Sequence, residues 1–173
     1  MSYNDTGFMT MLKNYGVVRI ICSVDFFIPL ILAILLTIIV YHYNIASSLL
    51  PDLATTYDTI ATGMIAIIIA ALAILVSMAD DNFIVLLKKI KVYDNILFTF
   101  WYSSILAGIS IAIDTGTAIL TKVTLTHSIV NLTLVFLTTF LTSYSVIAVI
   151  LAIGAVMRYG LYRAEFASLK YKK

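Results

Sequence analysis

Four long apolar stretches, separated by short polar segments, constrain this chain more than any other feature of its sequence. They cover roughly residues 17–43, 59–78, 96–121 and 129–157. An α-helix rises 1.5 Å per residue, so about 20 apolar residues cross a hydrocarbon core about 30 Å thick. We therefore predict an all-α membrane protein with four transmembrane helices. It forms a single domain over residues 1–173, with a helical tail at 158–173.

The composition supports this class of protein. Of the 173 residues, 62% are hydrophobic, and the mean hydropathy is +1.05. A soluble domain of this size would leave too much apolar surface in water, whereas lipid solvates such a surface. Cys22 is the one cysteine, which excludes an intrachain disulfide and the membrane thiol oxidoreductases, because both need a pair. The first apolar stretch is longer than the apolar part of a signal peptide, and we expect it to be retained.

Basic residues lie almost entirely on one side of the predicted spans. Ten of the 11 Lys and Arg residues precede the first stretch, lie between the second and third, or follow the fourth: Lys13, Arg19, Lys88, Lys89, Lys91, Arg158, Arg163, Lys170, Lys172 and Lys173. The exception is Lys122. Basic residues in short loops remain in the cytoplasm. We expect a multi-pass protein of the cell inner membrane with both termini in the cytoplasm.

Two basic segments are predicted to lie at the cytoplasmic surface. Between the second and third spans, Phe83, Leu86, Leu87 and Ile90 share one face of a short amphipathic helix. This helix is either a lever or docking surface, or a connector whose lysines meet anionic lipid headgroups. The tail either binds a soluble cytoplasmic partner or only enforces topology. The residues expected to make lipid or partner contacts are Lys88, Lys89, Lys91, Arg163 and Lys170.

Small residues recur at intervals of three or four along three spans, a pattern that permits close helix packing in lipid. They are Gly63, Ala66 and Ala70 in the second span, Ser104, Gly108, Ala112 and Gly116 in the third, and Ser145, Ala148, Ala152 and Ala155 in the fourth. Such faces form either the interior of a four-helix bundle or contacts between the subunits of a homo-oligomer, and the sequence leaves both open. The first span is rich in Ile and Leu and suits a lipid-facing position.

Two acidic side chains fall within apolar surroundings. Asp25 lies about 12 Å into the first span, counted from Val17, where an ionised Asp costs about 2.5 to 3.5 kcal/mol. Arg158 lies at a comparable depth in the fourth span, so we predict that it pairs with Asp25. An ion or proton site and exposure at the headgroup level are the alternatives for Asp25. Asp114 lies where the third span either ends, with Gly116 as a cap, or continues to the end of its apolar stretch.

The sequence offers no catalytic or cofactor-binding constellation. The motif Asp-Thr-Gly-Thr at 114–117 matches the active-site loop of aspartic proteases, but that chemistry needs two carboxylates that share a proton, on a β-rich scaffold. His42 and His127 have no further ligands at metal-binding spacing. We expect a protein that is not an enzyme, with no cofactor, no metal ion and no direct contact with nucleic acid.

The second span runs directly into the segment MADDNFIVLLKKIKVYDNILFTFWY at 78–102. Together with the four-span topology, this segment resembles the small four-span membrane proteins of prokaryotic anti-phage defence loci, including the membrane component of the Kiwa system. The resemblance implies a homo-oligomer in the inner membrane that works with a soluble partner in defence. It transfers no functional residue to this chain.

Two functions are therefore in competition. The first is a non-enzymatic oligomeric membrane component that acts as a sensor, an anchor or a membrane-disturbing effector. The alternative is a small ion channel or transporter that uses Asp25 or Asp114. Polar residues are scarce through the middle of the second and fourth spans, which counts against this alternative.

Overall fold

The computed structural model describes residues 23–77, 81–89, 92–122 and 128–171, and these are almost entirely helical. The helices are α3 (Val24–Tyr43), α4 (Ala46–Ser77), α5 (Asp81–Lys89), α6 (Val92–Lys122) and α7 (Ser128–Tyr171). Within these ranges, α3, α4, α6 and α7 are long and apolar enough to cross a membrane. By length and composition, the prediction of an all-α protein with four membrane-spanning helices is confirmed.

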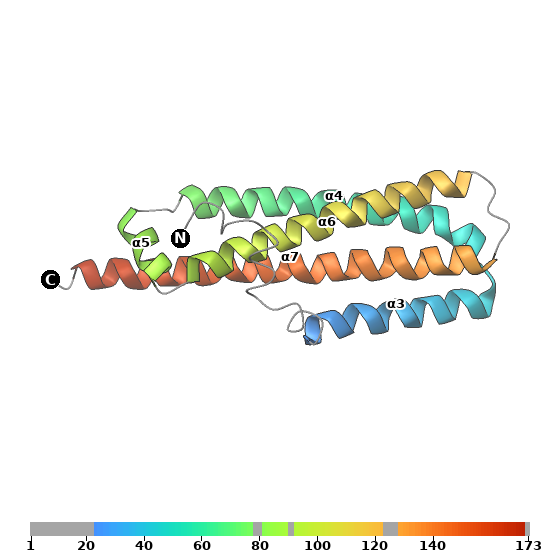
Figure 1. Ribbon diagram of the computed structural model, residues 1–173, viewed down its shortest axis with the longest axis horizontal. Helices are drawn as coiled ribbons and strands as arrows, with labels where there is room; N and C mark the ends of the chain where they lie inside the picture. The colour runs from blue at the N-terminus through green and yellow to red at the C-terminus, as the bar shows by residue number, and fades with distance from the viewer. Residues whose placement is uncertain (1–22, 78–80, 90–91, 123–127, 172–173) are drawn as a thin grey trace.

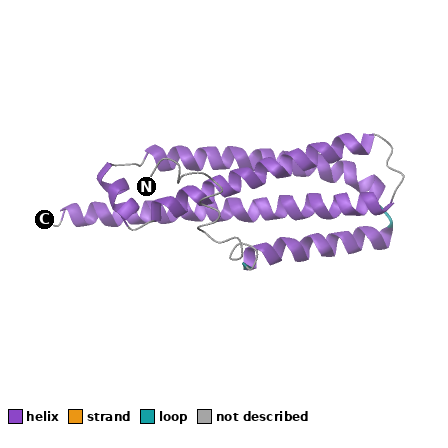
Figure 2. Cartoon of the chain, viewed as in Figure 1, coloured by secondary structure: helices purple, strands orange, loops and turns teal. Residues whose placement is uncertain are grey.

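The four long helices form an elongated antiparallel bundle (Figures 1 and 2). A tight turn at Asn44 joins α3 to α4, and its positive φ of 52° is a left-handed conformation that asparagine tolerates. The Asn44 N–H donates to the Tyr41 carbonyl at 3.2 Å. We call this end the loop end, because α6 also finishes there and α7 begins there. The opposite end, with α5 and the C-terminal part of α7, is the tail end (Figure 1).

The core is formed by three helices, α4, α6 and α7, whereas α3 lies mainly against α7. Buried positions in the three core helices follow a repeat close to 3.5 residues: Leu50, Ala54, Ala61, Met64, Ile68, Ala71 and Leu75 in α4; Ile96, Phe100, Ser103, Ala107, Ser110, Asp114 and Thr117 in α6; and Asn131, Val135, Thr138, Thr142, Ser145, Val149, Ala152, Ala155 and Tyr159 in α7. This is the repeat of left-handed coiled-coil packing.

The small-residue faces of the second and third spans are not in this core. Gly63, Ala66, Ala70, Gly108 and Ala112 are exposed on the outside of the bundle, and a Cβ added at Gly63 or Gly108 would meet nothing within 4 Å. Ser104 and Gly116 are partly exposed. Of the two alternatives for these faces, packing inside the bundle is therefore wrong for the second and third spans, and their use in subunit contacts stays a prediction. The small residues of α7 from Ser145 to Ala155 are buried.

The described part of the first span begins later than the apolar stretch suggested. Ser23 has an extended conformation and precedes the first residue of α3, Val24, while the predicted residues 17–22 lie outside the described ranges. Asp25 therefore lies in the first turn of α3, where an acid is favourable to the helix dipole. The 20 residues of α3 cover about 30 Å. Large side chains such as Ile31, Leu35 and Ile38 face outward along it.

Helix α5 packs its apolar side on the protein. Phe83 and Leu87 are buried, and the Phe83 ring contacts the rings of Tyr159 and Phe166 on α7 at centroid distances of 5.2 and 5.6 Å. Lys88 lies 5.7 Å from the centre of the Tyr93 ring on α6. Two of the four residues of the predicted apolar face, Phe83 and Leu87, therefore pack against the tail end of the bundle. Its placement at a membrane surface stays a prediction.

Candidate functional site

The buried core changes its chemistry about halfway along the bundle. Toward the tail end it is largely apolar, with Met64, Phe100 and Tyr159 among its members. Ser103 is the buried polar exception on α6, and its hydroxyl donates to the Phe100 carbonyl in its own helix. Toward the loop end, the buried side chains that α6 and α7 contribute are largely polar: Ser110, Asp114, Thr117, Thr138, Thr139, Thr142 and Ser145. We call these seven residues the polar core. Polar groups inside a membrane bundle are costly, and they mark candidate functional sites.

Asp114 lies at the centre of the polar core and is fully buried. Its Oδ2 accepts a hydrogen bond from the Ser110 hydroxyl at 3.0 Å and another from the Thr142 hydroxyl at 3.1 Å. The two hydroxyl oxygens are themselves 3.0 Å apart. Ser110 lies one turn before Asp114 on α6, while Thr142 lies on the facing helix α7, so the three oxygens form a triangle that joins the two helices.

The triangle has three contacts but only two hydroxyl protons. Ser110 and Thr142 each carry one proton, and when both donate to Asp114 no proton remains for the contact between them. A proton on Oδ2 of Asp114 would complete the ring, because each oxygen could then donate once and accept once. The geometry of these three residues therefore suits a neutral, protonated carboxyl group as well as an ionised one.

Other polar atoms near the triangle have no partner. Oδ1 of Asp114 and the hydroxyl of Ser145 are buried and make no hydrogen bond within the described ranges. Asp114 forms no ion pair within the described ranges, so its charge, when present, is stabilised by the hydroxyl groups of Ser110 and Thr142 and not by a cationic side chain. An unpaired carboxylate costs about 2.5 to 3.5 kcal/mol near the middle of a membrane helix on the insertion scale. Binding a proton or a small cation would remove that cost.

A second acid lies beside the polar core on α4. Thr115, the residue after Asp114, donates to Oδ1 of Asp58 at 3.1 Å. Asp58 is partly exposed and Thr115 is exposed, so this contact lies at the side of the bundle rather than inside it. The Tyr57 and Thr139 hydroxyls are 3.4 Å apart. These contacts tie α4 to both of the helices that hold the polar core.

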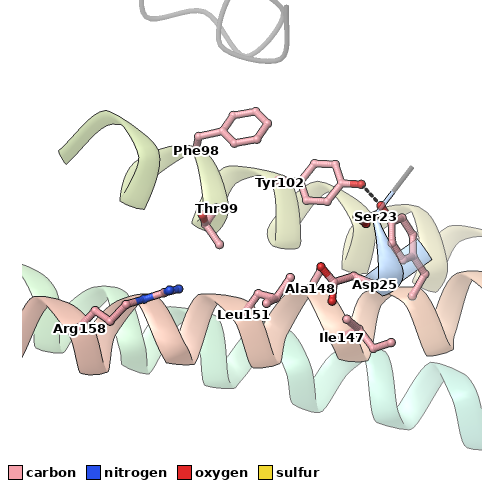
Figure 3. A pocket seen from close by; sticks show the side chains of 10 residues that line it. Ser23, Asp25, Phe98, Thr99, Tyr102, Ile147, Ala148, Leu151 and Arg158 are labelled. Carbon is pink, nitrogen blue, oxygen red and sulfur yellow. Dashed lines mark hydrogen bonds between the residues drawn. The ribbon is translucent and has the colours of Figure 1, made fainter. Parts of the chain in front are cut away.

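The other predicted acid, Asp25, lines a cleft between α3, α6 and α7 (Figure 3). The cleft has a volume of about 300 Å³ and also contains Arg158. Both charged side chains reach into the same space, but they remain apart, and no ion pair between them exists in this part of the chain (Figure 3). The predicted Asp25–Arg158 ion pair is therefore wrong, although the two groups do share one site.

Asp114 is not at a helix end. Helix α6 continues through Gly116 to Lys122, and Asp114 lies about 12 Å along the axis from that end. Of the two alternatives for the third span, the shorter one with a cap at Gly116 is wrong, and the longer one is correct. The carboxyl group is thus held between packed helices, which makes it a stronger candidate than an acid at a wet helix terminus.

The structure describes only some of the basic residues that are expected to contact lipid or a partner. Lys88 and Lys89 are exposed on α5, and Arg163 is partly exposed on α7. Lys91 and the side chain of Lys170 lie outside the described residues. Their contacts with lipid or with a partner stay predictions.

Comparison of the chain with protein-family models, with curated proteins and with solved structures finds no match. The site is therefore interpreted from its own geometry. The sequence identified Asp114 but missed Ser110 and Thr142 as its partners. The signal that would have found them is the 3.5-residue repeat, which places both hydroxyls and the carboxyl group on core positions of α6 and α7.

Proposed function

We propose that this protein is a small membrane transporter or channel for protons, or for a small cation in their place, with Asp114 as the binding group. The observation that carries the proposal is the triangle of Ser110, Asp114 and Thr142, which is buried and has one proton fewer than its three contacts can use. In a bundle of apolar helices, such a group is typical of proton relays.

The polar core also answers the argument against transport. Polar residues do occur in the middle of the fourth span, and Thr138, Thr142 and Ser145 all face the bundle interior. Thr117 carries the polar core toward the loop end, and Asn131 extends the buried polar surface beyond it. A proton that arrives from the loop end would therefore encounter hydroxyl and amide groups before it reaches Asp114.

The apolar interior of the tail-end half determines whether transport is gated or occurs through an open pore. On the tail-end side of the polar core, apolar side chains such as Met64, Phe100 and Val149 fill the interior. They offer a proton no continuous path. Uptake transfers a proton from a hydronium ion to the Asp114 carboxylate, which forms an O–H bond and leaves a water molecule. Release transfers that proton from Asp114 to a water molecule that has access to the other side of the membrane. The release step requires the tail-end half to open or to hydrate, so we infer gated transport rather than a permanently open pore.

Proton flux into liposomes tests this function. The purified full chain is reconstituted into vesicles that contain a pH-sensitive dye, and a potassium diffusion potential drives proton entry. We expect the Asp114→Asn variant to lower the flux more than about ten-fold relative to the unchanged protein, because an amide cannot take up the proton. The amide keeps the size of the carboxyl group and still accepts hydrogen bonds from both hydroxyls, so the fold is expected to persist.

Asp52→Asn is the matched control. Asp52 is exposed on α4, and the same chemical change there should leave the flux unchanged. Vesicles with the unchanged protein that are no leakier than empty vesicles would contradict the proposal, and so would an Asp114→Asn variant that conducts normally. Repeating the measurement with a sodium gradient and a sodium-sensitive dye distinguishes a small cation from a proton.

A second candidate function rests on the outward small-residue faces. We infer that Gly63 and Gly108 form contacts between copies of this chain, because small residues facing lipid leave the helix backbone open to a close neighbour. An oligomeric component of the inner membrane, which acts as a sensor, anchor or effector with a soluble partner in anti-phage defence, would use such faces. The long helix α7, which continues to Tyr171, would offer a surface for that partner.

Cysteine cross-linking in membranes tests this second candidate. In a Cys22→Ser background, Gly63→Cys and Gly108→Cys are expected to give covalent dimers under mild oxidation. Ile38→Cys on α3 is the control, because Ile38 also faces outward but lies among large side chains. Equal dimer yields at all three positions would indicate random collision and would contradict a specific interface.

A further inference from the structure

We propose that the cleft between α3, α6 and α7 is a water-filled vestibule on the tail-end side of the polar core, with Ser145 as the relay into it and Asp25 as the acid that receives the proton there. The proposal rests on the function proposed for Asp114, and it names the route by which a proton leaves that residue. Apolar side chains fill the interior of the tail-end half, so the route has to pass beside that interior. The cleft lies on that side, between the two core helices and α3.

The Ser145 hydroxyl is a buried polar group that the packing of the bundle does not explain. Ser145 is 0% exposed, and its Oγ makes no hydrogen bond within the described residues. Oδ1 of Asp114 is in the same condition. A buried polar atom without a partner is destabilising unless a water molecule reaches it. Two such atoms in one polar core indicate that water enters this part of the bundle.

Helix α7 leads from the polar core to the cleft in about two turns. Thr142 contacts the carboxyl group at the centre of the core, Ser145 follows three residues later, and Ala148 lines the cleft after three more. Residues three apart have Cβ atoms about 5 to 6 Å apart on one face of a helix, and a single water molecule bridges polar groups across such a gap. Ala148 is 3% exposed, so this last turn is closed and would act as the gate.

The cleft has the volume and the walls that water needs. Its volume of about 300 Å³ holds several water molecules, each of which needs two to four polar partners. All three helices supply polar side chains to it: Ser23 and Asp25 at the start of α3, Thr99 and Tyr102 on α6, and Tyr144 and Arg158 on α7. Arg158 is exposed, and it lies at the far end of the cleft from Asp25, toward the tail end (Figure 3). A guanidinium among apolar helices requires water or a polar partner.

Asp25 is the proton acceptor that the cleft offers. Its carboxyl group points into the cleft beside Ala148 and remains apart from Arg158 (Figure 3). In release, the O–H bond of Asp114 breaks, and each hydroxyl group or water on the route accepts one proton and passes one on. The last water transfers a proton to the Asp25 carboxylate, which forms an O–H bond. Asp25 then gives this proton to a water molecule that exchanges with the tail-end side.

Thiol labelling in membranes tests whether the cleft holds water. In a Cys22→Ser background, Ile147→Cys places a thiol in the cleft, and Ile150→Cys places one on the outside of the same helix, where Ile150 is 59% exposed. The reconstituted full chain is treated on both sides with a charged, water-soluble thiol reagent. We expect Ile147→Cys to react at least about ten-fold faster, because the reactive thiolate forms only in contact with water.

Proton flux through the same vesicles tests the route. Asp25→Asn and Ser145→Ala should each lower the flux more than about ten-fold, because each removes a group that carries the proton. Ser145→Ala breaks no hydrogen bond of the described chain, so the fold is expected to persist. The matched controls are Asp52→Asn, on the exposed side of α4, and Ser103→Ala, where a buried hydroxyl donates only to a carbonyl of its own helix. Both controls should conduct normally.

The outcomes separate this route from the function of Asp114. Equal labelling at the two positions, or faster labelling of Ile150→Cys, would overturn the vestibule. Normal flux in Asp25→Asn and Ser145→Ala, when Asp114→Asn does not conduct, would overturn the route and leave the function of Asp114 intact. An unchanged protein that conducts no protons would contradict that function and this route together, and the labelling rates would still decide whether the cleft is hydrated.

Discussion

The loop-end and tail-end halves of the bundle share one packing pattern but differ in what fills it. In the tail-end half, the core positions of α6 are mostly apolar, with Ser103 as the one polar member among Ile96, Phe100 and Ala107. In the loop-end half the same repeat continues with Ser110, Asp114 and Thr117. Helices α4, α6 and α7 pass through both halves without a break, whereas α3 begins near the level of Tyr144 and lies beside the loop-end half. The packing of the three core helices is therefore continuous along the bundle, while the chemistry of their interior changes.

This difference separates stability from function. An apolar interior in lipid is held by close packing, because lipid removes most of the hydrophobic force between helices. A polar interior contributes modest hydrogen-bond energy and carries the cost of unpartnered atoms such as Oδ1 of Asp114. We infer that the tail-end half contributes most of the stability and that the polar core is maintained for what it binds. The free energy of unfolding, measured by titration with a denaturing detergent, tests this inference.

The largest loss of stability is expected in the tail-end half. Phe100 is 1% exposed, and Phe100→Ala should lower the free energy of unfolding by about 2 to 3 kcal/mol through the cavity that it leaves. The loss is smaller than in a soluble core, because burial from lipid gains little transfer energy. Proton flux per folded molecule should remain. A loss of flux with no loss of stability would break the comparison.

A smaller loss is expected in the polar core. Thr142→Val removes a donor to Asp114 and a contact to Ser110 with almost no change of shape. The free energy of unfolding should fall by about 1 kcal/mol, in line with hydrogen bonds measured between membrane helices. Proton flux should fall by a larger factor than the loss of folded protein explains, because valine breaks the ring of hydrogen bonds among Ser110, Asp114 and residue 142. If Thr142→Val destabilises the protein more than Phe100→Ala, the polar core is the main source of stability and our inference is wrong.

Much of the fold could be predicted because hydropathy alone determines membrane-spanning length. The four spans and the continuation of the helix beyond Arg158 follow directly from apolar length and helix-forming residues. The sequence does not reveal which side of each helix faces inward. In lipid, both sides of a helix are apolar, so Gly63 and Ala66 suggested a packing face that the structure places outside.

The candidate site could be predicted only in part for the same reason. Asp114 is conspicuous as an acid in an apolar stretch, but Thr142 is one of several Ser and Thr residues in the fourth span. Only the common repeat of α4, α6 and α7 selects Thr142 as an interior residue. The cleft at Asp25 depends on where α3 begins, and the start of that helix at Val24 is hidden within a continuous apolar run.

The smallest effect is expected for a threonine on the outside of the loop-end half. Thr133 lies on α7 like Thr142, but it is exposed and donates to the carbonyl of Ile129 in its own helix at 2.9 Å. Thr133→Val makes the same change as Thr142→Val, and it leaves only a carbonyl that already serves the helix. The free energy of unfolding should change by less than about 0.3 kcal/mol, and the flux should be unaltered. The two variants make the same change on opposite sides of α7, one exposed and one buried. Equal effects would show that a threonine hydroxyl matters on this helix wherever it lies. The contrast between a functional interior and an inert surface would then be lost.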